Sequence, residues 1–250
     1  MAVSIKSARE IELMREAGKH LAHVHQELEA MIAPGISTWE IDAKGEKLIR
    51  DCGCIPNFLH YNGYPASICV SVNDEVVHGI PRKDRYLKEG DIVSLDAGLI
   101  YKGYHSDAAR THAVGKVSTE AQKLMDVTKQ SFFEGIKMAK EGQHLHDISR
   151  AIEEYVTPYG YGIVRDLVGH GIGTALHEDP QIPNYAQKRR GVRLQAGMTL
   201  AIEPMINAGT WQVRFLRDGW TVVTKDGSLS AHYENTILVT DGEPEILTLY

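Results

Sequence analysis

Apolar residues recur at helical spacing in four stretches of the chain, and each stretch has recognisable ends. A capping box of Ser7 and Glu10 opens the first stretch, and Ser37 begins a similar box in the second. Thr119 with Gln122 is the expected cap of the third. The pattern predicts helices from Ser7 to Pro34-Gly35, from Ser37 to Gly53, from Thr119 to about Lys140 and from about His146 to Val156.

Short apolar runs between and after these helices are typical of β-strands. The expected strands cover residues 67–72, 91–100, 104–114, 162–168, 198–205, 213–224, 230–239 and 245–249. No low-complexity linker divides the 250 residues, so we expect one domain over residues 1–250.

The order of elements occurs twice along the chain. An offset of 107 residues superimposes the helix breaks, for example Gly35 on Gly142 and Gly53 on Gly160. This repeat predicts two related halves, about 1–114 and 115–250. The same offset carries Asp96 onto Glu203, and each is a lone acid that closes an apolar strand.

A carboxylate among buried strand residues must be paired, protonated or bound to a metal. Asp96 is followed by a hairpin turn and then by Asp107. If the turn is Lys102-Gly103, Asp107 lies opposite Gly98 and diagonally across from Asp96, about 7–8 Å away at the backbone. A loop with an odd number of residues would point the two acids to opposite faces of the sheet. A structural ion pair is the alternative for either acid alone.

Composition narrows the class of protein. Hydrophobic residues make up 43% of the chain and charged residues 24%, which is ordinary for a soluble globular protein. The net charge of −6 disfavours nucleic-acid binding, which needs a basic surface. No apolar run approaches the ~18 residues of a membrane span, and the N-terminus lacks a signal-peptide core. Three cysteines without a CxxC motif fit a reducing cytosol. We expect a cytoplasmic monomer without DNA or membrane partners.

The second half of the chain adds further metal-binding residue types. Glu203 and Glu234 close or lie within apolar strands, and His170 stands between two glycines that let the backbone bend. With Asp96 and Asp107 they make a hard, anionic donor set. Such a set suits two divalent ions, Mn²⁺, Fe²⁺, Co²⁺ or Zn²⁺, better than one structural zinc.

These five residues, together with His78 in Val77-His78-Gly79-Ile80-Pro81 and His177 in Leu176-His177-Glu178-Asp179-Pro180, resemble the methionine aminopeptidases. The resemblance covers the whole chain and is to the short, type I form. It implies an α+β pita-bread fold, with two pseudo-two-fold related halves and a curved antiparallel sheet covered by two helix pairs.

The resemblance also implies a role for each residue. Asp107 and Glu234 would bridge both metals, Asp96 would chelate one, and His170 with Glu203 would bind the other. Glu203 would move a proton from the attacking water to the leaving amine. His177 would stabilise the oxyanion, and His78 would contact the substrate near the leaving side. The expected reaction is dinuclear metal-hydroxide attack on the first peptide bond, which removes the initiator methionine from nascent polypeptides whose second residue is small.

The methionine side chain would lie in a pocket of aromatic rings and sulfur, which suits a thioether. The matching positions are Tyr61, Tyr64, Cys69 and Trp220. Phe58 and Leu176 depart from many bacterial relatives, so they bear on pocket shape and inhibitor preference.

Two alternatives remain at this stage. An Xaa-Pro peptidase of the same fold is the first, although such enzymes are expected to carry an additional N-terminal domain. A ribosome-binding protein without enzymatic activity is the second, although it would be expected to lose ligands that are all present here. Lys188, Arg189 and Arg190 are expected to lie in a solvated loop, with contact to ribosomal RNA as the alternative.

The chain has twelve histidines, and most are expected to be structural. His20, His23 and His25 are interpreted as an ordinary helix face. His60, His105, His112 and His232 flank the predicted site, and their spacing assigns them no role.

Overall fold

The computed structural model describes residues 3–249. The helices are α1 (Ala8–Glu29), α2 (Thr38–Asp51), α3 (Thr119–Ile136) and α4 (Leu145–Val156), with 3₁₀ turns η1 (Tyr61–Gly63) and η2 (Thr157–Tyr159). The strands are β1 (Ile55–Pro56), β2 (Ile68–Val72), β3 (Glu75–Val77), β4 (Ile92–Tyr101), β5 (Tyr104–Ala113), β6 (Gly162–Ile163), β7 (Gly169–Gly171), β8 (Glu178–Ile182), β9 (Thr199–Ile202), β10 (Met205–Asn207), β11 (Val213–Phe215), β12 (Val222–Thr224), β13 (Ser230–His232), β14 (Glu234–Leu238) and β15 (Glu245–Ile246).

The main sheet is antiparallel and contains both early and late strands of the chain. Within residues 3–249 it has nine strands, in the order β1-β4-β5-β14-β9-β7-β8, with β2 also paired to β4 and β15 to β14. The pairing of β5 with β14 links early and late strands at its centre. Two smaller sheets, β13-β10-β6 and β11-β12-β3, complete the strand structure.

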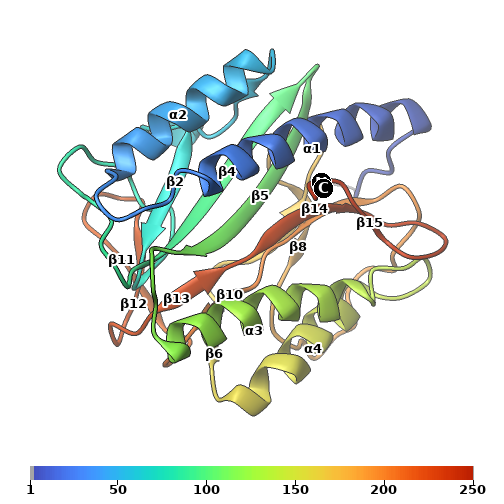
Figure 1. The fold of residues 1–250 in the computed structure, drawn as a ribbon. Coiled ribbons are helices and arrows are strands. Elements are labelled where there is room, and N and C mark those ends of the chain that lie inside the picture. Colours follow the sequence, from blue (N-terminus) through green and yellow to red (C-terminus); the bar gives the residue numbers. More distant parts are fainter. Residues whose placement is uncertain (1–2, 250) are drawn as a thin grey trace.

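Two helix pairs cover the sheet (Figure 1). The α1–α2 pair packs on β2, β4 and β5 through residues such as Leu21 and Leu28, and α3 and α4 form a second core with β9 and β14. On β4, Val93, Leu95 and Ala97 belong to the core beneath α1 and α2. Since side chains alternate along a strand, Asp96 points to the opposite face of the sheet.

The first two helices begin at the predicted capping boxes. Ser7 and Ser37 each accept a hydrogen bond from the backbone of a glutamate three residues later, and that glutamate returns one to the serine backbone. None of the helices within residues 3–249 is long and apolar enough to cross a lipid bilayer.

The third helix begins at Thr119 as predicted, but its predicted cap and its predicted end are wrong. Ser118, rather than Thr119, is the cap, because its hydroxyl accepts a hydrogen bond from the backbone of Ala121 at 3.1 Å. The helix ends at Ile136 rather than near Lys140. The residues after Ile136 leave the helix, and Lys140 forms an isolated β-bridge with Thr240.

Three long predicted strands are each divided in two. Residues 198–205 form β9 and β10, which are separated by Glu203-Pro204, and residues 230–239 form β13 and β14, which are separated by Tyr233. In both places the chain leaves one sheet and enters another. Residues 213–224 form β11 and β12 around a turn held by the carboxylate of Asp218.

The strand predicted at 162–168 is reduced to β6. The strands β1, β3, β7 and β8 were not expected from the sequence. They are two to five residues long, too short for a periodic pattern to reveal.

Candidate active site

The β4–β5 hairpin brings two acids to one face of the main sheet. Tyr101 pairs with Tyr104 and Gly98 with Asp107, so the turn has two residues, as predicted. Asp96 pairs with Ala109, which puts its side chain diagonal to that of Asp107.

Two further acids lie where the chain changes sheets. Glu203 follows β9 directly, and the next residue is Pro204, which has no backbone N–H to continue the ladder. Glu234 begins β14 opposite Ala109 of β5. The backbone N–H of Tyr233 donates to the carbonyl of Pro204 at 3.2 Å, which keeps the two breaks side by side.

His170 lies at the middle of β7, between two glycines. Neither glycine has a positive φ, but the pairing of β7 with β8 shifts register between His170 and Gly171, as at a β-bulge. The glycines also allow close packing: a Cβ at Gly169 would lie 2.4 Å from the carbonyl oxygen of Ala201, and one at Gly171 would lie 2.2 Å from that of Asp179.

The imidazole of His170 has a defined tautomer. Its Nδ1 lies 2.8 Å from the carbonyl oxygen of Gly171, which can only accept, so Nδ1 carries the proton. The lone pair of Nε2 then faces the acids, 3.6 Å from Glu203 Oε1 and 3.9 Å from Asp107 Oδ2. Burial lowers the pKa of His170 to about 4, which keeps the ring neutral. This is the arrangement of a metal-binding histidine.

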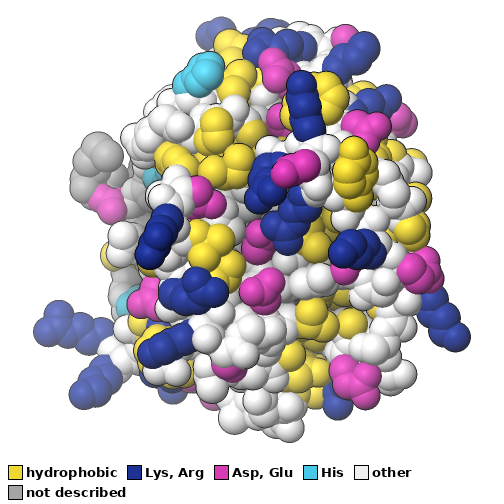
Figure 2. Space-filling model, turned by 90° about the vertical axis from the view of Figure 1, so that its left-hand side faces the viewer, with side chains coloured by type: hydrophobic (Ala, Val, Ile, Leu, Met, Phe, Trp, Pro, Cys, Tyr) yellow, Lys and Arg dark blue, Asp and Glu magenta, His cyan; other side chains and the backbone are white. Residues whose placement is uncertain are grey.

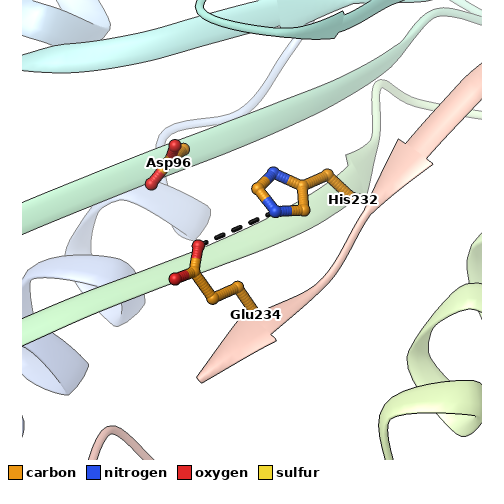
Figure 3. Close-up of side chains that lie close together, drawn as sticks. All are labelled: Asp96, His232 and Glu234. Carbon is orange, nitrogen blue, oxygen red and sulfur yellow. Dashed lines mark ion pairs between the residues drawn. The ribbon is translucent and has the colours of Figure 1, made fainter. Parts of the chain in front are cut away.

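Within residues 3–249, two groups of side chains are close enough to hold a cation. In each group the ligand atoms lie within 4.8 Å of one another, and both groups include Glu234. One is Asp107, His170 and Glu234, and the other is Asp96, His232 and Glu234, drawn in Figure 3. Oδ1 of Asp96, Oδ1 of Asp107 and Oε1 of Glu234 are buried and have no hydrogen-bond partner.

The electrostatics of the cluster fit a divalent cation. Burial raises the pKa of Asp96 to about 7. Burial, together with the neighbouring carboxylates, also raises the pKa values of Asp107, Glu203 and Glu234 well above their ordinary range. Within residues 3–249, no lysine or arginine lines the cavity to offset these charges. Buried carboxylates without a cationic partner are stabilised by a bound metal ion.

His232 is the one member of these groups to which the sequence assigned no role. Its Nε2 lies 3.7 Å from Oε2 of Glu234 and 3.9 Å from Oε2 of Glu203, and it has no hydrogen-bond partner. Burial lowers its pKa to about 3, so the ring is neutral. No local pattern indicates this place for His232, because the chain leaves one sheet and enters another at Tyr233, between His232 and Glu234.

All predicted site residues line one cavity of about 290 Å³. Its polar end holds the four acids and His170, and its other end is lined by Phe58, Tyr61, Tyr64, Cys69, Leu176 and Trp220. The rings of Tyr64 and Trp220 pack edge to face at 5.2 Å, and the hydroxyl of Tyr64 donates to the carbonyl of Gly79 at 2.9 Å. Apolar and aromatic surface therefore adjoins the charged cluster.

Two further histidines border the same cavity. His78 has a left-handed backbone, with φ of 58°, and its ring lies 6.3 Å from that of Trp220. Burial lowers the pKa of His78 to about 4. The ring of His177 lies 4.3 Å from that of His170, and partial burial lowers its pKa. Both rings can offer a hydrogen bond to a ligand in the cavity.

His25, interpreted from the sequence as part of an ordinary helix face, has a structural contact in α1. Its side chain is buried, and Nε2 donates to the carbonyl of Ala108 at 2.8 Å, which joins α1 to β5. His25, Arg110 and His112 line a second cavity, of about 460 Å³, between α1 and α3 on the helix-covered face of the sheet. That cavity contains none of the predicted site residues.

Comparison with known proteins places this geometry among metallopeptidases. The model of metallopeptidase family M24 matches residues 12–241. A protein of Clostridium acetobutylicum described as "Methionine aminopeptidase" is 54% identical over 247 residues, which are 99% of each chain. The crystal structure of a methionine aminopeptidase from Thermotoga maritima matches with a TM-score of 0.97 and 46% identity, over all of both chains.

A more distant match has the same fold with an additional part. An Xaa-Pro dipeptidase from Bacillus anthracis matches with a TM-score of 0.76 and 26% identity, and the match covers 98% of this chain but 61% of that one. The expected pita-bread fold is thus confirmed. The comparisons favour the methionine aminopeptidases over the proline peptidases.

Proposed function

The chain belongs to metallopeptidase family M24, and from this we propose that it is a methionine aminopeptidase, a hydrolase that removes the initiator methionine when the second residue is small. One observation carries this proposal. A single cavity joins a cluster of buried acids to a pocket of aromatic rings and sulfur. The acids suit a metal-dependent hydrolysis, and the pocket suits an unbranched thioether.

The proposed cofactor is a pair of divalent ions, Co, Mn, Fe or Zn. Asp107 and Glu234 would contact both ions, Asp96 would bind one, and His170 with Glu203 would bind the other. The presence of Glu234 in both groups of ligand atoms, and the buried oxygens of Asp96, Asp107 and Glu234 without hydrogen-bond partners, support this assignment. Bound divalent ions supply the Lewis acidity that polarises the scissile carbonyl.

Other steps of the reaction would depend on Glu203, His177 and His78. Glu203 would take a proton from the attacking water and deliver it to the leaving amine. His177 would donate a hydrogen bond to the oxygen of the scissile carbonyl as negative charge develops there. His78 would contact the substrate beyond the scissile bond.

The pocket would select the first residue of the substrate. Tyr61, Tyr64, Cys69 and Trp220 would enclose the methionine side chain. Phe58 and Leu176 line the same cavity and would narrow or widen that pocket.

The proposed setting is the cytoplasm, with nascent polypeptide N-termini as substrates and the protein acting as a monomer. We treat residues 1–250 as one catalytic unit in which the halves 1–114 and 115–250 both supply ligands. Transient ribosome contact is compatible with this role. Lys188, Arg189 and Arg190 offer little free positive charge for such a contact, because Arg190 pairs with Asp147 at 2.7 Å. On the face shown in Figure 2, basic side chains are interspersed with acidic ones.

A panel of short peptides tests the proposal. Bulk at the second residue would push the scissile carbonyl out of position, and an error of about 1 Å can lower a rate about 100-fold. Peptides that begin Met-Gly, Met-Ala or Met-Ser should lose methionine, and those that begin Met-Lys, Met-Leu or Met-Glu should stay nearly intact, as mass spectrometry would show.

Two results would count against the proposal. Equal loss of methionine from Met-Lys and Met-Ala peptides would show that the enzyme does not select substrates by the size of the second residue. Release of an arbitrary residue before proline would instead support the proline-specific alternative.

A further inference from the structure

Tyr61 contacts His177 directly at the mouth of the cavity. The phenolic oxygen lies 2.8 Å from Nδ1 of His177, and the ring centroids are 5.4 Å apart. Among the hydrogen bonds within residues 3–249, this is the one that reaches the ring of His177. The His177 side chain is exposed, and its ring packs against the rings of His170, at 4.3 Å between centroids, and of Tyr61.

The hydrogen bond also decides where the imidazole carries its proton. A neutral imidazole has one N–H and one lone pair, and the partner of one nitrogen sets the role of the other. A phenol is a stronger donor than acceptor, because its oxygen lone pair is delocalised into the ring. Tyr61 therefore donates to Nδ1, and the proton of His177 remains on Nε2.

The loop around Tyr61 holds this hydroxyl in place. His60 and Asn62, on either side of it, both have left-handed backbones, with φ of 67° and 49°. Backbone hydrogen bonds fix the turn, among them Tyr61 to Phe58 at 2.9 Å and Tyr64 to Tyr61 at 2.9 Å. Non-glycine residues adopt this conformation where the surrounding structure over-determines it, and such sites cluster around function.

The backbone of His177 is anchored from the other side. The next residue, Glu178, forms an ion pair with Lys6 at 2.7 Å, in which the lysine side chain is 4% exposed. Glu178 also accepts a hydrogen bond from the backbone of Ala175 at 3.2 Å. Glu178 thus anchors the main chain next to His177, and the hydrogen bond from Tyr61 acts on the ring itself.

We propose that Tyr61 is a positioning residue for His177, in addition to lining the methionine pocket. Its hydroxyl would hold the imidazole as the Nε2–H tautomer, with that N–H directed toward the scissile carbonyl. The inference rests on the proposed function, in which His177 donates to that oxygen. It adds a role for the hydroxyl that pocket lining does not require.

Tyr61→Phe tests the hydroxyl alone, since the ring that lines the pocket is kept. With a Met-Ala substrate, kcat should fall about 10- to 100-fold, as expected for a misdirected catalytic donor. KM should change by no more than about 2-fold, because the ground-state contacts of the methionine side chain remain. A raised KM with unchanged kcat would overturn the proposal and leave Tyr61 as a pocket residue only.

A spectroscopic measurement tests the contact without any turnover. In metal-free protein with ¹⁵N-labelled histidine, the two ring nitrogens of His177 should report the Nε2–H tautomer. Tyr61→Phe should give a mixture of tautomers. Tyr104→Phe is the matched control, because it removes a hydroxyl that donates to Glu10 at 2.9 Å, and Tyr104 does not line the cavity. An unchanged His177 signal in Tyr61→Phe would overturn the proposal.

A double-mutant cycle separates this inference from the proposed function. If Tyr61 acts through His177, Tyr61→Phe should have no further effect on kcat in a His177→Ala background. Full additivity of the two losses would overturn the inference and leave the proposed function standing. Absence of methionine release by the unmodified protein would instead refute the proposed function, whereas the tautomer measurement would still report the contact.

Discussion

Among residues 3–249, the buried acids of the cavity have no cationic side chain beside them, which distinguishes them from Glu75, another buried acid of the chain. Glu75 is also buried, but it pairs with Arg85. Asp107 and Glu234 lie among other carboxylates, and each has an oxygen without a hydrogen-bond partner. An unpaired buried charge persists when a ligand compensates it.

Removing a shared ligand should therefore abolish both metal binding and activity. We expect Asp107→Ala and Glu234→Ala to lose bound metal, as measured by elemental analysis, and to release no methionine. Glu75→Gln is the control, since it neutralises a buried acid outside the cavity and should keep its metal. Full activity in either alanine variant, or in protein treated with EDTA, would contradict the metal assignment.

His177 should behave differently from the acids. If it stabilises the oxyanion without binding metal, His177→Ala should retain the metal and lower kcat by about 10²–10³-fold. Metal content and steady-state kinetics on the same preparation give both quantities. Loss of a metal ion from this variant would show that His177 is a ligand.

Some residues could be placed from sequence and others could not. Asp96 and Asp107 follow from an even hairpin loop, because two-residue periodicity fixes which side chains share a face. The contact of His25 could not be predicted, because its partner, the carbonyl of Ala108, is distant in sequence. His232 lies with the acids because the chain changes sheets next to it, and local patterns do not encode that change.

At the scale of elements, helices were predicted better than short strands. Capping boxes and breaks at glycine are local signals, so α1 and α2 begin where expected. Strands of two or three residues, such as β3 and β7, exist only through their partners. The breaks at Glu203-Pro204 and Tyr233 were missed because apolar residues continue on both sides.

The corrected cap of α3 gives a test by stability. Ser118→Ala removes the hydroxyl that accepts from the backbone of Ala121, so the free energy of unfolding should fall by about 1 kcal/mol. Thr119→Ala, one residue into the helix, should have a smaller effect. Denaturant unfolding of both variants measures the difference. A larger loss for Thr119→Ala would restore the cap expected from sequence.

At the scale of the whole molecule, the proposed metal centre joins distant parts of the chain. Asp96 and Asp107 come from the first half, and His170, Glu203 and Glu234 come from the second. An unfolded chain does not hold these groups together, so a metal bound to them favours the native state. Folding and metal binding are therefore expected to be coupled.

This coupling predicts a metal-dependent melting temperature. A ligand at 100 times its Kd stabilises the native state by about 2.7 kcal/mol, which corresponds to a rise of about 5–10 °C for a chain of this size. Calorimetry with Mn²⁺ and with EDTA should show that difference. The melting temperature of Asp107→Ala should not respond to Mn²⁺. A response equal to that of the unmodified protein would locate the stabilising metal elsewhere.

Asp96 and Glu203, the two acids that the predicted repeat would make equivalent, differ in how their backbones are held. Asp96 lies within a ten-residue strand that is paired on both edges, to Cys69 and to Ala109. Glu203 stands at a break, where Pro204 interrupts the ladder. The main chain under Asp96 is therefore held by two neighbouring strands, whereas the main chain at Glu203 lies where the chain passes from one sheet to another.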